Sequence, residues 1–507
     1  MLNRFFHSVI NHPRVTLIIV FVITLILALS IPKLKIDFSI EHLFSKNDPN
    51  VEKYFSFRDT FGREDNVITI IYKPHNIYEK NLYIQLEELT YKIESLNGVK
   101  SIASIFTLSD IDENAWLGDL YSDASDWNEK HITKKLKYIQ QDPSIGSRVL
   151  SKDLQYGTII VALKDSANNH KNRTALLEEI KQLTNNEFSE WTFSGVSVLR
   201  SEYVRYMLRD NFLFLPPMAF LLISILTFVF RNWVYVFLPM LTVLITVIWL
   251  LGIMGLAGLE INIMTYIVPT LLFIIGIGDA IHIQARFREN FSKTPANPKQ
   301  AMFQTMSQMS RVIFLTSITT SIGFLALMTT SIKIVQEFGM EISIGVMIAW
   351  LVSILVVPSG IILSKKFHVK KKDFFLPALS WLSNSIPKNP WMFILIPSVI
   401  VMTCTYKIKD ISTNSSLMDD LRPKNKLYQD LKLTEKYFGG VLPFEVLIKT
   451  NERKNDEDTS VLNQKILEIT KKVESILKSE LKNSRFFSIN DLIASAKRIY
   501  SKNVEKM

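Results

Sequence analysis

The sequence predicts an α-helical, polytopic membrane protein with seven transmembrane helices and two external α/β domains. Three observations support this fold class: long runs without a charged residue, basic residues in alternate short loops, and a β-α-β pattern between the first two runs. The chain has 507 residues, of which 48% are hydrophobic. A soluble protein would interrupt its apolar segments with polar residues every turn or two.

Each apolar run is long enough, or nearly so, to cross a bilayer, because about 20 apolar residues span the hydrocarbon core. The first run ends in Ser30-Ile31-Pro32 without a small-x-small cleavage pattern, so we expect an uncleaved helix rather than a signal peptide. The seven runs cover residues 15–32, 212–230, 233–259, 261–278, 312–332, 342–363 and 391–406.

The basic residues predict the orientation of these helices. The net charge of +10 does not point to nucleic acid, because the lysines and arginines gather in two of the short loops. This is the positive-inside asymmetry, which places the N-terminus in the cytoplasm and residues 33–211 and 407–507 on the opposite side. The residues concerned are Arg286, Arg288, Lys293, Lys299 and Arg311 in one loop, and Lys365, Lys366, Lys370, Lys371, Lys372 and Lys388 in the other.

The segment after the first helix predicts a domain with its own core. Two β-α-β units are expected there, which is typical of an α/β sandwich of the ferredoxin-like type. The sole cysteine, Cys404, lies in the seventh run, so disulfides are not expected to stabilise the external domains. The predicted strands are 66–72, 98–106, 157–163 and 190–195, with helices at 78–96 and near 173–185, and a helix at 198–214 that continues into the second run.

A long internal repeat is visible at an offset of 377 positions. Pro13 corresponds to Pro390 at the start of a transmembrane run, and Phe61-Gly62 corresponds to Phe438-Gly439 at the start of an external domain. The second repeat is incomplete before Met507. We therefore expect either a truncated chain, which we favour, or completion by a separate polypeptide. The expected domains are 1–32 (first transmembrane helix), 33–211 (first external domain), 212–363 (helices two to six), 364–390 (basic linker), 391–406 (seventh helix) and 407–507 (start of the second external domain).

Three segments carry a resemblance to a known family: GIGDAIHIQARFRE (276–289), FLTSITTSIGFLAL (314–327) and FGMEISIGVMIAWLVSILVVPS (338–359). With the order of domains, they resemble the resistance–nodulation–cell division (RND) superfamily, and most closely its MMPL-type lipid exporters and hopanoid transporters. The usual fourth-helix motif of that family is similar to Gly-x-Gly-x-Asp-Tyr-x-x-His. Here the spacing is one residue shorter and Ala280 replaces the aromatic residue, so a mechanism that needs an Asp–Tyr pair is not implied.

The resemblance implies proton-driven transport through a carboxylate in the fourth helix, which would be Asp279. Placing an aspartate within a membrane costs about 2.5–3.5 kcal/mol on insertion scales, and such residues usually have a function. Because a low dielectric favours the neutral form of a carboxylate, Asp279 could gain and lose a proton. The alternative is that Asp279 lies near the cytoplasmic end of its helix and reaches the interface.

Neighbouring residues complete the predicted site. His282 either relays protons or caps the helix at the headgroups, and Gly276 and Gly278 allow another helix or water to approach. Four hydroxyl side chains of the fifth helix either face Asp279 or bond to carbonyls of their own helix. These are Thr316, Ser317, Thr319 and Thr320. Arg286 and Arg288 are expected to be cytoplasmic anchors, and Glu337 and Glu341 to lie at the outer interface.

The leading functional hypothesis is a proton-driven exporter of hydrophobic or lipid-like molecules in a bacterial inner membrane. The alternatives are a proton-driven accessory module for protein translocation and a lipid sensor that does not transport. The sequence has no Walker A motif, zinc-binding pattern or nucleophile elbow, so no enzyme activity, cofactor or metal is expected. The expected partners are the lipid-like substrate, the membrane, and a missing second half or another copy of the chain.

Overall fold

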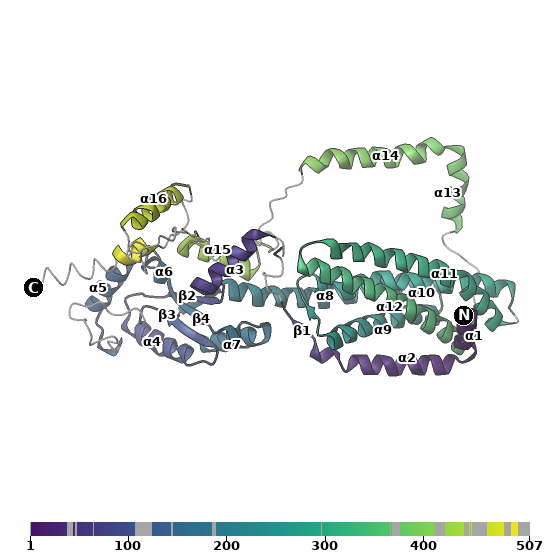
Figure 1. The fold of residues 1–507 in the computed structure, drawn as a ribbon, viewed down its shortest axis with the longest axis horizontal. Helices are drawn as coiled ribbons and strands as arrows, with labels where there is room; N and C mark the ends of the chain where they lie inside the picture. The colour runs from purple at the N-terminus through teal and green to yellow at the C-terminus, as the bar shows by residue number, and fades with distance from the viewer. Residues whose placement is uncertain are drawn as a thin grey trace, which may run out of the picture. The chain divides into compact units, whose positions relative to one another are not determined.

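The computed structural model divides the chain into two compact units (Figure 1). Unit 1 comprises Met1–Val51 and Val204–Ser415, and unit 2 comprises Glu52–Tyr203 and Ser416–Met507. The residues that the structure describes are 2–37, 44–45, 48–63, 65–106, 124–142, 146–184, 189–295, 297–365, 367, 376–410, 421–440, 446, 448, 464–480 and 488–494.

Among the described residues, seven helical segments are long and apolar enough to cross a membrane, in agreement with the seven predicted runs. Several helices extend beyond their predicted apolar runs; the sixth begins nine residues before its run and so includes Glu337 and Glu341. The helices are α2 (Pro13–Ala28), α8 (Val196–Phe230), α9 (Trp233–Ala257), α10 (Val268–Lys293), α11 (Pro298–Leu325), α12 (Lys333–Ser364) and α14 (Pro390–Lys407).

Shorter elements of unit 1 flank these helices. The two short strands β1 and β6 pair in parallel, with Lys35 opposite Glu260. The elements are α1 (Leu2–Asn11), η1 (Ile31–Lys33), β1 (Lys35–Ile36), β6 (Glu260–Ile261), η5 (Thr265–Ile267), η6 (Ala326–Thr329), α13 (Leu376–Lys388) and η7 (Ile408–Asp410).

Close packing between α10 and α12 fixes their alignment. A Cβ atom on Gly345 would lie 2.7 Å from Leu272, and one on Gly276 would lie 3.5 Å from Ala349. Both contacts join residues 73 positions apart, so the two helices run in the same direction in constant register. Small residues at such contacts let helix backbones approach closely, which is how membrane helices gain packing energy without a hydrophobic driving force.

Unit 2 contains a four-stranded antiparallel sheet with strand order β3-β4-β2-β5. The four strands predicted from their β-branched residues are all present, and the chain order β2-α4-β3 and β4-α7-β5 gives two β-α-β units. The elements of unit 2 are α3 (Pro49–Phe61), β2 (Val67–Pro74), α4 (Lys80–Glu94), β3 (Val99–Ala103), η3 (Ala124–Asp126), α5 (Glu129–Gln140), α6 (Gly146–Val149), β4 (Gly157–Leu163), η4 (Asp165–Ala167), α7 (His170–Leu183), β5 (Ser189–Ser194), α15 (Lys426–Phe438) and α16 (Gln464–Glu480).

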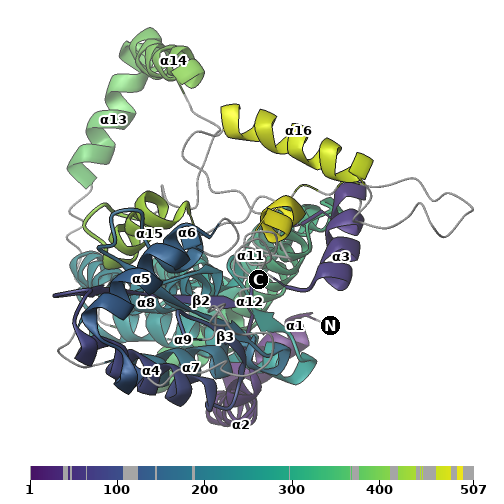
Figure 2. The same cartoon turned by 90° about the vertical axis from the view of Figure 1, so that its left-hand side faces the viewer.

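The core of unit 2 lies between the sheet and helices α4 and α7, which are side by side on one face of the sheet (Figures 1 and 2). Alternate residues of β2 and β4, among them Ile70 and Val161, point into this core and are fully buried. Leu86 of α4 and Ile180 of α7 meet them from the helical layer. The alternation follows from the two-residue period of a strand.

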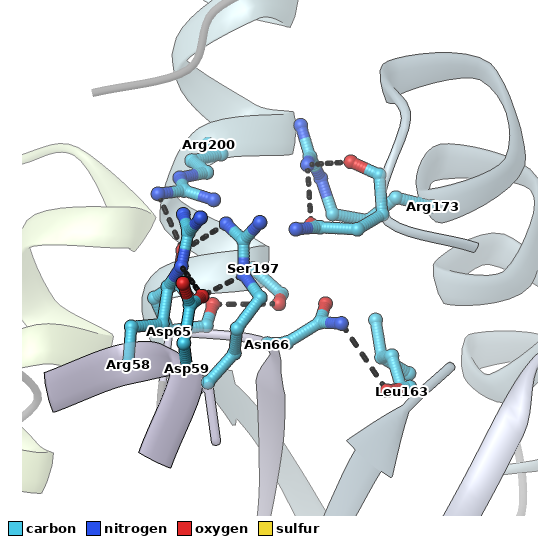
Figure 3. A network of polar contacts seen from close by, with 10 residues as sticks. Arg58, Asp59, Asp65, Asn66, Leu163, Arg173, Ser197 and Arg200 are labelled. Carbon is cyan, nitrogen blue, oxygen red and sulfur yellow. Dashed lines mark hydrogen bonds and ion pairs between the residues drawn. The ribbon is translucent and has the colours of Figure 1, made fainter. Parts of the chain in front are cut away.

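A polar network joins the start of β2 to the start of α8 (Figure 3). Arg200 of α8 forms an ion pair with Asp65 at 2.7 Å, and Arg63 contacts the same carboxylate oxygen at 2.7 Å. The Ser197 hydroxyl donates to the backbone carbonyl of Asp65. Although burial alone would raise it, hydrogen bonds and charges from Arg63 and Arg200 hold the pKa of Asp65 below its ordinary value. The network anchors the first turns of the helix that continues into the second span.

The internal repeat extends to the boundaries of the helices. Both ends of α3 and α15 differ by 377 positions, as do both ends of η1 and η7 and the first residues of α2 and α14. Gly62 after α3 and Gly439 after α15 both have positive φ, at 91° and 85°. Glycine adopts this conformation readily, so each helix can end at the same point. The strand expected within 437–450 falls largely outside the described residues.

Candidate functional site

Asp279 lies in the middle of α10 and not at its end. Fourteen residues of the helix follow it, and Ile283, Gln284 and Phe287 among them are fully buried inside unit 1. The side chain of Asp279 itself is half-buried. The helix thus continues about four turns beyond the aspartate, with Arg286 and Arg288 among the residues that follow it.

Ser317 of α11 is the hydroxyl that reaches this carboxylate. Its Oγ donates a hydrogen bond to Asp279 Oδ2 at 3.4 Å, and the serine is only 4% exposed. The bond is long for an O–H donor, whose usual distance is about 2.5–3.0 Å. The contact therefore orients the two side chains without strongly stabilising a negative charge.

The other three predicted hydroxyls bond to their own helix. Thr316 donates to the carbonyl of Ile313 at 2.8 Å, Thr319 to that of Leu315 at 2.9 Å, and Thr320 to that of Thr316 at 2.8 Å. Thr316 and Thr319 are exposed on unit 1. The structure thus brings one of the four residues to Asp279. Thr316 and Thr319 lie on other sides of the helix, whereas Thr320 is about one turn from Ser317 but bonds to the carbonyl of Thr316.

The two predicted glycines have different surroundings. A Cβ atom on Gly276 would meet Val243 of α9 at 3.3 Å and Ala349 of α12 at 3.5 Å. This glycine therefore lies where α10 packs closely against α9 and α12, and we call the contact of α10 with α12 the seam. A Cβ atom on Gly278 would meet no other atom within 4 Å. The position just before Asp279 therefore has no neighbouring element packed against it.

His282 and the two arginines lie beyond Asp279 on α10. His282 is exposed, one turn after the aspartate. The Arg286 Nε donates to Gln308 Oε1 at 2.8 Å, and its guanidinium pairs with Glu289. The structure does not bring Arg286 to Asp279.

Two serines that the sequence reading missed extend the polar contacts from Ser317. Ser321 lies one turn further along α11, and its hydroxyl is 2.5 Å from the hydroxyl of Ser343 on α12. Both are at least 95% buried. The signal for Ser321 was its i+4 spacing from Ser317, which places the two on the same face of a helix. No comparable signal identified Ser343.

Glu341, expected at the outer end of its span, is a buried residue of α12. It is 1% exposed, and neither carboxylate oxygen has a hydrogen-bond partner within the described structure. Glu337, one turn earlier, accepts a hydrogen bond from Asn262 at 2.8 Å and pairs with Lys333 at 3.4 Å. Because α12 begins at Lys333, Glu341 lies about two turns into the helix.

Comparison with known proteins agrees with the resemblance noted in the sequence. The MMPL family matches residues 88–390, which run from within α4 to just beyond α13 and include the whole of the Asp279 region. The chain is also 22% identical over 382 residues to "Putative membrane protein MJ1562" of Methanocaldococcus jannaschii, a match that covers 72% of this chain and 94% of that protein. With seven helices able to span a membrane and a family match over more than half its length, the chain belongs to the MMPL family of multi-pass, RND-type permeases.

Proposed function

We propose that this protein exports hydrophobic or lipid-like molecules across a bacterial inner membrane, driven by the proton gradient. The observation that carries the proposal is the position of Asp279. It directly follows the uncharged run 261–278 within α10, is half-buried, and receives one long hydrogen bond from Ser317 of α11.

Such a carboxylate can bind and release a proton as its surroundings change. In an apolar environment the neutral acid is favoured, and contact with water favours the ionised form. Each proton that moves down a potential of 100 mV supplies about 2.3 kcal/mol. Alternating between the two states would shift α10 against α11, since the Ser317 contact changes with the charge on Asp279.

The proposed orientation follows from the basic residues. The loops after α10 and α12 carry most of the lysines and arginines that flank the spans, which favours a cytoplasmic position for both loops and for the N-terminus. The sheet of unit 2 would then be periplasmic. Its strand order and its two β-α-β units support assignment to the ferredoxin-like type.

The test is proton-coupled transport by the full chain in proteoliposomes with an imposed pH gradient. The probes are an internal pH dye and a fluorescent phospholipid. Asp279→Asn should reduce both signals to those of protein-free vesicles, because asparagine keeps the shape of a neutral carboxyl but cannot titrate. Asp279→Glu should retain part of the flux, and Ser317→Ala should reduce it less than Asp279→Asn does.

Glu289→Gln is the matched control. Glu289 lies on the same helix in a partly exposed ion pair with Arg286 and Lys293, and its loss should leave flux unchanged. If Asp279→Asn transports like the unmodified protein, Asp279 is a structural residue and the proton-driven mechanism is wrong. Phospholipid binding without gradient-driven movement would instead favour a lipid sensor.

A further inference from the structure

Glu341 is a buried carboxyl that the proposed mechanism does not use. It is 1% exposed within unit 1, and both of its side-chain oxygens lack a hydrogen-bond donor among the described residues. A buried charge without a partner is among the most costly arrangements in a protein. An ionised Glu341 would therefore have no hydrogen-bond donor among the described residues to stabilise it.

The charged neighbours of Glu341 make ionisation less favourable still. Glu337 lies one turn earlier on α12, so a negative charge there would repel a second one on Glu341. Lys333 pairs with Glu337 at 3.4 Å. The amide of Asn262 also donates to Glu337 and not to Glu341.

Tight packing surrounds this part of α12. One turn after Glu341, a Cβ atom on Gly345 would lie 2.7 Å from Leu272 of α10. Two residues before it, a Cβ atom on Gly339 would lie 2.5 Å from the carbonyl oxygen of Phe324 at the end of α11. Two neighbouring elements thus approach α12 at van der Waals distance on either side of the glutamate.

A proton fits this site better than a metal ion does. Oxygen-binding cations take six or more ligands in most protein sites. Within the described residues, no group of three or more histidine, cysteine, aspartate or glutamate side chains is placed to hold a metal ion. A single bound proton removes the charge without any further ligand.

We propose that Glu341 holds a proton at neutral pH and is a second proton-binding site of the bundle, separate from Asp279. The register of α10 and α12 places Glu341 at the level of Val268, eleven residues before Asp279, which is about 16 Å along the helix. The pairs Leu272–Gly345 and Gly276–Ala349 occupy the seam between them. Loss of the proton would put an unpaired charge at this seam and favour separation of α10 from α12.

This inference extends the proposed proton-driven function, but protonation of Glu341 can be measured without transport. The experiment records the infrared carbonyl band of protonated carboxylic acids in the full chain at neutral pH. Glu341→Gln should remove one carboxylic-acid band. Glu337→Gln, the matched control one turn away, should retain that band because it leaves Glu341 unchanged and removes the carboxylate that pairs with Lys333 instead.

The results that would overturn the proposal are distinct. An unchanged spectrum in Glu341→Gln means that Glu341 is ionised, and a band that disappears when sodium ions are added means that a metal cation occupies the site. The Asp279→Asn variant tests the proposed function independently of the proposal for Glu341. If this variant transports normally while the Glu341 band is present, the proton-driven mechanism through Asp279 fails and the second site stands.

Thermal unfolding gives a second measurement. A proton that is bound in the folded state and released in the unfolded state makes stability fall as pH rises. The unmodified protein should therefore lose stability on going from neutral to alkaline pH, whereas Glu341→Gln and Glu341→Leu should lose less. If both variants are less stable at neutral pH than Glu337→Gln, the charge of Glu341 supports the fold and the proposal is wrong.

Discussion

The ion pair between Asp65 and Arg200 is expected to contribute strongly to the stability of unit 2. Their side chains are 14% and 5% exposed and approach to 2.7 Å. Removing one partner of a buried pair typically costs about 3–5 kcal/mol, because the other charge stays buried. For Asp65→Asn we expect about 3 kcal/mol, the lower end, since asparagine can still accept one hydrogen bond.

Asp59→Asn is the control for this variant. Asp59 also faces an arginine, Arg58, but at 3.9 Å and with 76% of its own side chain exposed (Figure 3). Exposed pairs contribute about 0–1 kcal/mol, so this substitution should have little effect. A double substitution is also informative. Replacing both Asp65 and Arg200 by apolar residues should restore part of the stability that is lost in Asp65→Asn.

The assay is hydrogen exchange of the β2 and β5 amides in the full chain. It reports the stability of unit 2 by itself, which is needed because a chain with two compact units does not in general unfold in a single two-state transition. A loss of about 3 kcal/mol corresponds to exchange about 100-fold faster. The pH dependence has a defined sign. Since the pKa of Asp65 is lowered in the folded state, its stabilisation is present above the ordinary value of 3.8 and is lost as pH falls through the folded-state value. Equal exchange in Asp65→Asn and Asp59→Asn would refute the reasoning.

Three further predictions concern other parts of the chain. Burial raises the pKa of Asp430 in α15 to about 6. The packing of α15 on the sheet should therefore strengthen as pH falls from about 7 to 5. The measurement is hydrogen exchange of the α15 amides, and Asp430→Asn should remove this pH dependence. Gly345→Ala should lower the melting temperature of the bundle, because the added Cβ would lie 2.7 Å from the buried Leu272. Gly323→Ala is the control and should be neutral or stabilising, because its Cβ would have no atom within 4 Å. Equal melting temperatures would contradict the close contact between α10 and α12. Reporter fusions near residues 120 and 460 should score as external and fusions near 295 and 375 as cytoplasmic, and a cytoplasmic signal at 120 would overturn the proposed orientation.

Much of the fold is determined by local sequence. The seven spans follow from uncharged runs, because hydrophobicity over about 20 residues does not depend on what a helix packs against. The strand 157–163 was predicted to the residue, since its β-branched side chains and flanking turn residues are local signals. The repeat was found from two short anchors and is seen again in the boundaries of α3 and α15.

Side-chain partners were decided by tertiary structure. The sequence placed four hydroxyls near Asp279 but could not tell which would face it, because that depends on how α11 is rotated against α10. The structure selects Ser317 and adds Ser321 with Ser343. It also shows that Glu341 is buried within the protein, because hydropathy marks where an apolar run begins but not where the helix begins or what packs on it. Local composition therefore determined that this chain crosses a membrane and carries an acidic residue within a span, whereas helix packing decided which polar groups are partnered and which are buried alone.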